Sequence, residues 1–362
     1  MTTNSRGAAG VLASPRRGWR AVLVAALLTS FARPAFWPVA LVGFLARGGI
    51  LAFLVPIVVL PTPSGVADVI APAITSFAFG LVSPAFVAIV ATTIGALLGW
   101  VVLGGIAGAW ADVELTRATA AEEDLRAEIS NGAARPVPAV RRVVMRAFLV
   151  RLIAHLPLWL VLSWGAVRIG QATYAELVTP FEVVTPLAIR VLGDVPETIG
   201  IVLAAWLLGE IAGGLAVRRV VLDSATGPAA VRDGWLDIVR RPVSTLAVGA
   251  ATDLAVALAV VPSILAANVV WGWVRNVILA RSRPLDIAAA LVLFVAVWLG
   301  GIVVTAAATT WRSVAWTAEE MRRRAAAAAS PRPGSQAASG TFGDADHARP
   351  GGWSPSDPSG RL

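Results

Sequence analysis

Long apolar stretches alternate with short polar connections along most of the chain, and six of these stretches are long enough to cross a membrane. A helix rises about 1.5 Å per residue, so about 20 residues span the roughly 30 Å hydrocarbon core of a bilayer. We therefore expect an all-α, polytopic membrane helix bundle. Its six predicted transmembrane helices cover residues 36–60, 84–109, 157–178, 198–217, 243–261 and 285–310.

The six predicted helices form three similar hairpins. Residues 98–115, 198–217 and 297–313 each place Gly-Gly or Gly-Glu before an Ile, followed by small residues and then by charge. Odd-numbered helices begin after a basic residue and a proline, as at Arg33-Pro34 and Arg241-Pro242. This recurrence predicts an internal repeat of one hairpin.

Two pairs of glycines on even-numbered helices have the spacing of close helix packing. Gly104 with Gly108, and Gly209 with Gly213, are four residues apart. The GxxxG spacing lets two helix backbones approach each other in a membrane. We expect all four glycines to pack helices, because no strand or loop precedes them as a phosphate-binding loop requires.

Short basic segments and polar tails flank the predicted membrane domain of residues 18–317. Arg20 precedes an apolar run, and residues 140–155 carry Arg142 and Arg146 four positions apart. Such segments favour amphipathic helices that lie at the membrane interface. The polar composition of residues 1–17 predicts a disordered tail. For residues 318–362 we expect a short basic helix followed by a second disordered tail.

Composition supports a membrane protein and argues against several other classes. Of the 362 residues, 57% are hydrophobic and 14% are charged, whereas soluble domains carry about 25% charged residues. No cysteine is present, which excludes disulfides and thiolate metal sites. The 30 basic residues are all arginine. We attribute them to topology and to anionic lipid headgroups at the cytoplasmic face rather than to nucleic acid.

The distribution of arginine predicts the orientation in the cell (inner) membrane. Most arginines fall in the terminal regions and in residues 112–156 and 218–241, which would all lie on one side. Only four fall in the connections on the other side: Arg190, Arg275, Arg281 and Arg283. Because basic residues accumulate in cytoplasmic connections, we expect a multi-pass protein with both termini cytoplasmic.

Four ionisable side chains lie several residues inside the predicted transmembrane helices. They are Arg47, Arg168, Glu210 and Asp253. A charge at the centre of a membrane helix costs about 2.5–3.5 kcal/mol on insertion scales, so such groups are expected to face the bundle interior and to pair. We therefore predict an intramembrane polar site made of these four residues.

This site allows three readings of the function. The first is a transporter-like or membrane-organising protein, in which the arginines hold an anionic group and the carboxylates balance charge or carry protons. The second is a structural or partner-binding subunit whose charges only hold the bundle, so that loss of Asp253 would partly offset loss of Arg47. The third, an intramembrane enzyme acting on lipid phosphates, lacks a recognisable catalytic constellation.

No motif identifies a known family or a cofactor. His155 is the only histidine outside the predicted tails, and a lone histidine near an interface is usually a structural polar residue. Two distant histidines without cysteine do not supply the ligands of a zinc site. We expect no metal, no cofactor and no enzymatic activity, and we leave a protein partner or an oligomer open.

Overall fold

The structure is a computed structural model that describes residues 18–54, 56–57, 83–131, 140–178 and 187–329. Within these residues the chain is helical and contains no strand. The helices are α1 (Trp19–Ala32), α2 (Phe36–Phe44), the π-helix η2 (Leu45–Gly49), α3 (Ile50–Leu54), α5 (Pro84–Asn131), α6 (Val140–Ala154), α7 (Leu156–Val178), α8 (Leu187–Asp194), α9 (Pro196–Asp223), α10 (Gly227–Arg240), α11 (Pro242–Leu279) and α12 (Pro284–Ala329).

Prolines and a serine define where several of the long helices begin. Pro196, Pro242 and Pro284 occupy the first positions of α9, α11 and α12. A proline is tolerated there because its missing N–H has no partner within the helix. Ser83 caps α5, since its Oγ accepts a hydrogen bond of 3.1 Å from the backbone N–H of Phe86.

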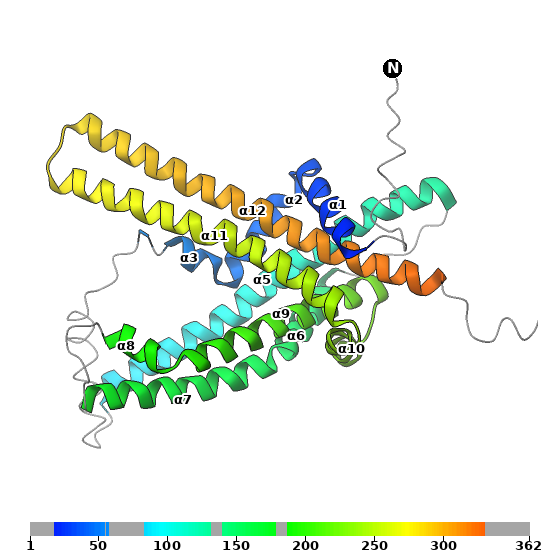
Figure 1. Ribbon diagram of the computed structural model, residues 1–362, viewed down its shortest axis with the longest axis horizontal. Coiled ribbons are helices and arrows are strands. Elements are labelled where there is room, and N and C mark those ends of the chain that lie inside the picture. The colour runs from blue at the N-terminus through cyan, green and yellow to red at the C-terminus, as the bar shows by residue number, and fades with distance from the viewer. Residues whose placement is uncertain (1–17, 55, 58–82, 132–139, 179–186, 330–362) are drawn as a thin grey trace, which may run out of the picture.

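Two helical arms diverge from a common base (Figure 1). One arm is the antiparallel pair of α11 and α12, and the other contains α5, α7 and α9. Helices α2, α5, α6, α9 and α10 close the base, where α2 packs against both α12 and α5. The hydrophobic core lies at this base. It includes Ile211 and Leu215 of α9, Val248 of α11 and Trp316 of α12.

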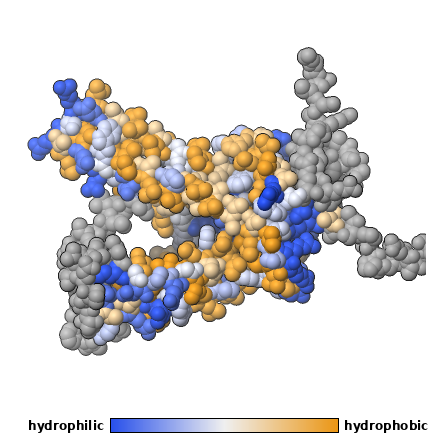
Figure 2. Space-filling model, viewed as in Figure 1, coloured by the Kyte–Doolittle hydropathy of each residue, from blue (hydrophilic) through white to orange (hydrophobic). Residues whose placement is uncertain are grey.

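The arms themselves expose apolar side chains, which Figure 2 shows along both of them. Within the described residues, five helices are long and apolar enough to cross a membrane. The count becomes six if α6 and α7, which are bent by 45° at their junction, form one span. Exposed apolar side chains in such numbers are unfavourable in water but are well solvated by lipid acyl chains. These are the helices of an integral membrane protein; the arrangement in three hairpins stays a prediction.

The helices extend beyond the predicted spans in several places. The helix that contains the span expected at 84–109 continues to Asn131, where the charged residues after the span predict its end, and the helix expected at 243–261 continues through Pro262 to Leu279. Residues 227–240, expected as a loop, form α10. The predicted tails at 1–17 and 330–362 lie outside the described residues, while residues 318–329 belong to α12 as the expected short helix.

Helix α6 corresponds to the basic segment at 140–155. Its apolar face is buried against α5, α9 and α10 through Val143, Ala147, Val150 and Ala154. Arg142 and Arg146 are exposed on the opposite face. The two-faced pattern was therefore read correctly, but neighbouring helices cover the apolar face that was expected to rest on lipid.

Candidate functional site

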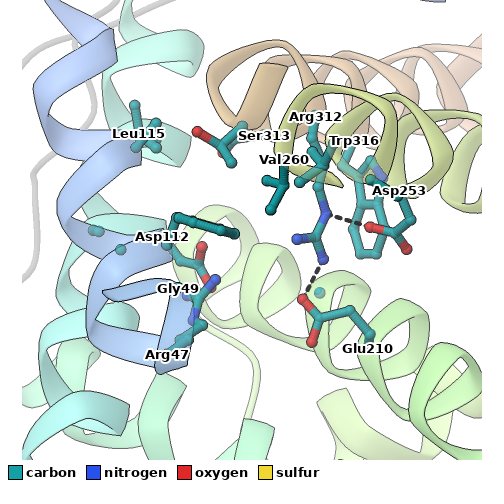
Figure 3. Close-up of a pocket in the computed structure, with 18 of the residues that line it drawn as sticks. Arg47, Gly49, Asp112, Leu115, Glu210, Asp253, Val260, Arg312, Ser313 and Trp316 are labelled. Carbon is teal, nitrogen blue, oxygen red and sulfur yellow. Dashed lines mark hydrogen bonds and ion pairs between the residues drawn. The ribbon is translucent and has the colours of Figure 1, made fainter. Parts of the chain in front are cut away.

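A cavity of about 390 Å³ lies where the two arms meet the base. Its lining combines residues of both arms with residues of α2, η2 and α6. Figure 3 shows Arg47 and Asp112 on one side of the cavity and Arg312, Glu210 and Asp253 on the other. The charged side chains of the lining therefore face each other across one space.

Six of these side chains form a continuous chain of alternating charge, which we call the central ion-pair network. In spatial order it consists of Arg47, Asp112, Arg151, Glu210, Arg312 and Asp253. The Arg47–Asp112 contact measures 2.5 Å and the Arg312–Asp253 contact 2.7 Å. Each guanidinium thus lies next to a carboxylate, as charges removed from water require.

Each candidate span among the described residues contributes one member of the network. The members come from η2, α5, α6, α9, α11 and α12. Spans adjacent in sequence supply one arginine and one carboxylate that pair directly: Arg47 with Asp112, Arg151 with Glu210, and Arg312 with Asp253. Contacts of Arg151 with Asp112 and of Arg312 with Glu210 then join the three pairs.

A break in the first span presents Arg47 to the cavity. Arg47 belongs to the π-helix η2, and Gly48 beside it has a φ of 109°. This conformation favours glycine, since it brings a Cβ into conflict with the backbone. Single π-helical turns inside α-helices are frequent at functional sites.

The glycines of α5 make room for this segment. Gly104 faces the backbone carbonyl of Ala46, and a Cβ at Gly108 would lie 2.6 Å from Nε of Arg47. Arg47 also donates a 2.6 Å hydrogen bond to the carbonyl of Gly108. The guanidinium therefore packs against α5 at Gly108 and contacts Asp112 on the same helix.

The glycines of α9 bring α6 close in a similar way. A Cβ at Gly209 would lie 3.2 Å from the ring of His155, and one at Gly213 would lie 3.4 Å from Ala154 and Arg151. His155 Nε2 is 3.4 Å from Oε2 of Glu210, and its Nδ1 is 2.8 Å from the carbonyl of Arg151. The histidine thus contacts both members of the Arg151–Glu210 pair.

Among the described arginines that line the cavity, Arg218 is the one that forms no ion pair with a carboxylate. It is 3% exposed and lines the cavity. Within the described residues it donates only to neutral oxygens: the Gly214 carbonyl at 2.8 Å, the Ser313 carbonyl at 3.1 Å and Thr317 Oγ1 at 3.2 Å. Its guanidinium carbon and that of Arg312 each lie 5.2 Å from the centre of a Trp316 ring.

The predicted site residues separate into two groups. Arg47, Glu210 and Asp253 line the cavity, whereas Arg168 is exposed on α7 and is not among the lining residues. Helix α7 packs mainly on α8 and α9, through residues such as Gly165, so the remainder of its surface is open. Arg168 therefore does not meet the other three.

Four charged residues of the cavity were not predicted from the sequence: Asp112, Arg151, Arg218 and Arg312. The first three lie in segments expected as basic connections, and Arg312 lies in the expected C-terminal region. A signal was present for two of them, because Asp112 and Arg218 each follow a glycine, Gly108 or Gly214, by four residues. That spacing places the charge on the same helix face as the closely packed glycine.

The cavity suits an anion better than a metal ion. Among the described residues, no three carboxylate or imidazole groups gather closely enough to hold a metal. The lining holds four guanidiniums and, in the described part of the chain, three carboxylates, so one positive charge is left over. The chain matches no family model, no curated protein and no solved structure.

Proposed function

We propose that this protein is transporter-like: it binds an anion-bearing solute in the central cavity and moves it across the membrane. The observation that carries the proposal is Arg218, a buried guanidinium at the cavity wall whose partners are all neutral oxygens. A buried charge with no counter-charge in direct contact is costly. A bound anion would supply that counter-charge.

The size and shape of the cavity support the same proposal. Its volume of about 390 Å³ lies within the roughly 300–1,000 Å³ typical of small-molecule sites. Transporters often bind their substrate near the membrane centre, at helices that are interrupted there. Here the interrupted segment is η2, which carries Arg47 into the cavity.

The diverging arms offer a route for movement. The cavity lies at the point where they separate, and the base beyond it is held by a second group of ion pairs, the distal ion-pair cluster. That cluster includes the contact of Arg219 in α9 with Asp237 in α10 at 2.5 Å and that of Arg324 in α12 with Asp223 in α9 at 2.8 Å. Access from the other side of the membrane would require these pairs to separate while the arms close.

A structural clasp is the second candidate function. It is favoured by the central ion-pair network taking one residue from each candidate span among the described residues. In this case the network would lock the bundle and the cavity would hold only water. The protein would then serve as an organising or partner-binding subunit.

Ligand stabilisation separates the two candidates. Purified protein in detergent is heated with inorganic phosphate, acetate, oleate or phosphatidylglycerol, and its melting temperature is measured. A site for anions predicts that at least one of them raises the melting temperature, because a ligand that binds only the folded state stabilises it. Arg218→Gln should abolish the increase, whereas Arg168→Gln should leave it unchanged.

Flux in proteoliposomes then tests movement. The anion that gives the largest increase is radiolabelled, and its exchange across vesicles of phosphatidylcholine is followed. Glu210→Gln and Asp253→Asn remove one network charge each and should slow the exchange. Unchanged exchange in both variants contradicts transport through this cavity, and an absence of stabilisation by all four anions favours the clasp.

We further propose that the protein lies in the cell membrane with both termini cytoplasmic. The exposed arginines Arg141, Arg142, Arg240 and Arg241 support this orientation, because they cluster on α6 and around the end of α10. In that position they would contact anionic headgroups of the cytoplasmic leaflet.

A further inference from the structure

The cavity has two chemically different ends. Its inner wall carries Arg218 and Glu210, which are 3% and 6% exposed. Its outer wall is apolar and opens to the surface, with Trp206 of α9 43% exposed and Val261 of α11 52% exposed. A ligand that fills the cavity therefore meets charge at one end and hydrocarbon-like surface at the other.

The outer wall continues onto the arms. Val260 lies at the side of the cavity beside Arg312 (Figure 3), and Ala257 and Phe44 also belong to the apolar lining. Figure 2 shows a hollow between the arms with apolar surface on both sides. In a membrane this hollow faces the acyl chains of lipids, so an apolar chain can leave the cavity sideways without entering water.

The charge of the lining sets the charge of the headgroup. Four guanidiniums stand against three carboxylates among the described lining residues, so a single negative charge completes the balance. A carboxylate and a phosphodiester each carry one negative charge at neutral pH. Inorganic phosphate carries more charge and has no apolar part to cover Trp206, Val260 and Val261.

We propose that the ligand is a monoanionic amphiphile, with its oxyanion at Arg218 and its apolar chain leaving the cavity past Trp206 and Val261. This inference rests on the proposed function and specifies its substrate class. The shared chemistry is one negatively charged oxygen group joined to a hydrocarbon chain, as in a fatty acid or phosphatidylglycerol. Guanidiniums suit such a group because they donate paired hydrogen bonds to oxyanions.

The test is a binding titration of delipidated protein in a nonionic detergent. Radiolabelled oleate and phosphatidylglycerol serve as amphiphile probes, with phosphatidylcholine, acetate and inorganic phosphate as comparators. We expect saturable binding of one oleate or one phosphatidylglycerol per protein. Acetate, phosphate and phosphatidylcholine should compete at least about tenfold more weakly, since each lacks either the chain or the net charge.

Two variants address the two ends of the cavity, each with a matched control. Arg218→Gln removes the positive charge that would bind the headgroup, and Ala257→Trp fills the apolar end without changing any charge. Each should weaken binding about tenfold. Arg168→Gln removes an arginine outside the cavity, and Leu258→Trp adds the same ring at the next, 64% exposed position of α11. Both controls should stay within about twofold of the parent. Ala257→Trp keeps the test decisive if Arg218→Gln fails to fold.

The possible outcomes distinguish this inference from the proposed function. If acetate or phosphate binds as tightly as oleate, or if Ala257→Trp binds oleate as the parent does, the amphiphile is wrong and an anion site remains. If phosphatidylcholine binds equally well, the headgroup charge is irrelevant and the inference is overturned. If none of the anions binds, both proposals fail.

Discussion

At the scale of single residues, Arg47 shows how the network is assembled. Its guanidinium contacts Asp112 at 2.5 Å, whereas Asp253 pairs with Arg312 at the other end of the central ion-pair network. Asp253 also has a buried Oδ2 that accepts no hydrogen bond within the described residues. The partner that should compensate for loss of Arg47 is therefore Asp112 and not, as the sequence suggested, Asp253.

Arg47→Ala should destabilise the protein, because it removes one partner of a largely buried ion pair. Breaking a buried ion pair usually lowers the free energy of unfolding by at least about 3 kcal/mol. We expect a loss of no more than this here, because Asp112 keeps its contact with Arg151. A double-mutant cycle with Asp112→Ala should show a coupling energy of about 1–3 kcal/mol. Unfolding in detergent by added sodium dodecyl sulfate measures these free energies.

The matched control is a cycle of Arg47→Ala with Asp253→Ala. These two residues stand at opposite ends of the network and share no direct contact, so their coupling energy should be smaller than that of Arg47 with Asp112. Strong coupling of Arg47 with Asp253, together with no coupling of Arg47 with Asp112, would mean that the pairing described here is incorrect.

Gly48→Ala tests the break beside Arg47. A Cβ at Gly48 would meet nothing within 4 Å, so any cost comes from its backbone φ of 109°. We expect a loss of about 1–3 kcal/mol in the free energy of unfolding. Gly95→Ala is the control, because Gly95 also has open space around it but lies inside the regular helix α5. If Gly48→Ala and Gly95→Ala have the same free energy of unfolding, the helix is regular at Gly48 and the break next to Arg47 does not exist.

At the scale of elements, the hydrophobic pattern predicted where helices form, but it did not predict which helices pack against each other. The two faces of α6 could be read from the sequence, but which neighbours cover Val143 and Ala147 depends on where α9 and α10 lie. Helix α11 was expected to end before Pro262, since proline removes one helical hydrogen bond. It continues, because membrane helices tolerate a proline, which here leaves only the carbonyl of Leu258 without its helical donor. The hydroxyl of Ser263 donates a 2.6 Å hydrogen bond to the neighbouring carbonyl of Ala259.

Close packing of α9 against α12 gives a prediction at this scale. A Cβ at Gly214 would overlap the indole ring of Trp316, whose Nε1 donates a 2.8 Å hydrogen bond to Thr252 of α11. Gly214→Ala should therefore lower the free energy of unfolding by about 1–3 kcal/mol, as overpacking does in cores. A melting curve in detergent detects the change.

Gly200→Ala on the same helix is the control for this prediction. A Cβ there would have nothing within 4 Å, and alanine favours a helix over glycine by about 1 kcal/mol. Gly200→Ala should therefore melt at or above the temperature of the parent. If Gly214→Ala is equally harmless, the indole of Trp316 does not pack where the structure places it.

At the scale of the whole molecule, the length of the apolar stretches predicted a membrane helix bundle. The charged residues of its interior could not be predicted in this way, because they are brought together by the packing of the helices. Asp112 and Arg312 sit just beyond the apolar stretches that defined the predicted spans, so hydropathy alone assigned them to connections. The pairing of Arg151 with Glu210 joins α6 to α9 across 59 positions of sequence. No local pattern specifies such a contact. A regular repeat of three hairpins would explain why the first and second, third and fourth, and fifth and sixth spans each supply one arginine and one carboxylate.

The number of membrane crossings provides the final prediction, and it depends on whether the bent pair α6–α7 forms one span. The chain has no cysteine, so single cysteines introduced by Gly18→Cys, Thr226→Cys and Arg281→Cys report their own side of the membrane. With six crossings, positions 18 and 226 share the cytoplasmic side and position 281 is opposite. A membrane-impermeant maleimide should then label only Arg281→Cys in intact cells, and all three variants after permeabilisation. If α6–α7 does not cross, position 226 moves to the side opposite position 18, and position 281 joins position 18. Labelling of Thr226→Cys but not Arg281→Cys in intact cells would therefore contradict the six-span arrangement.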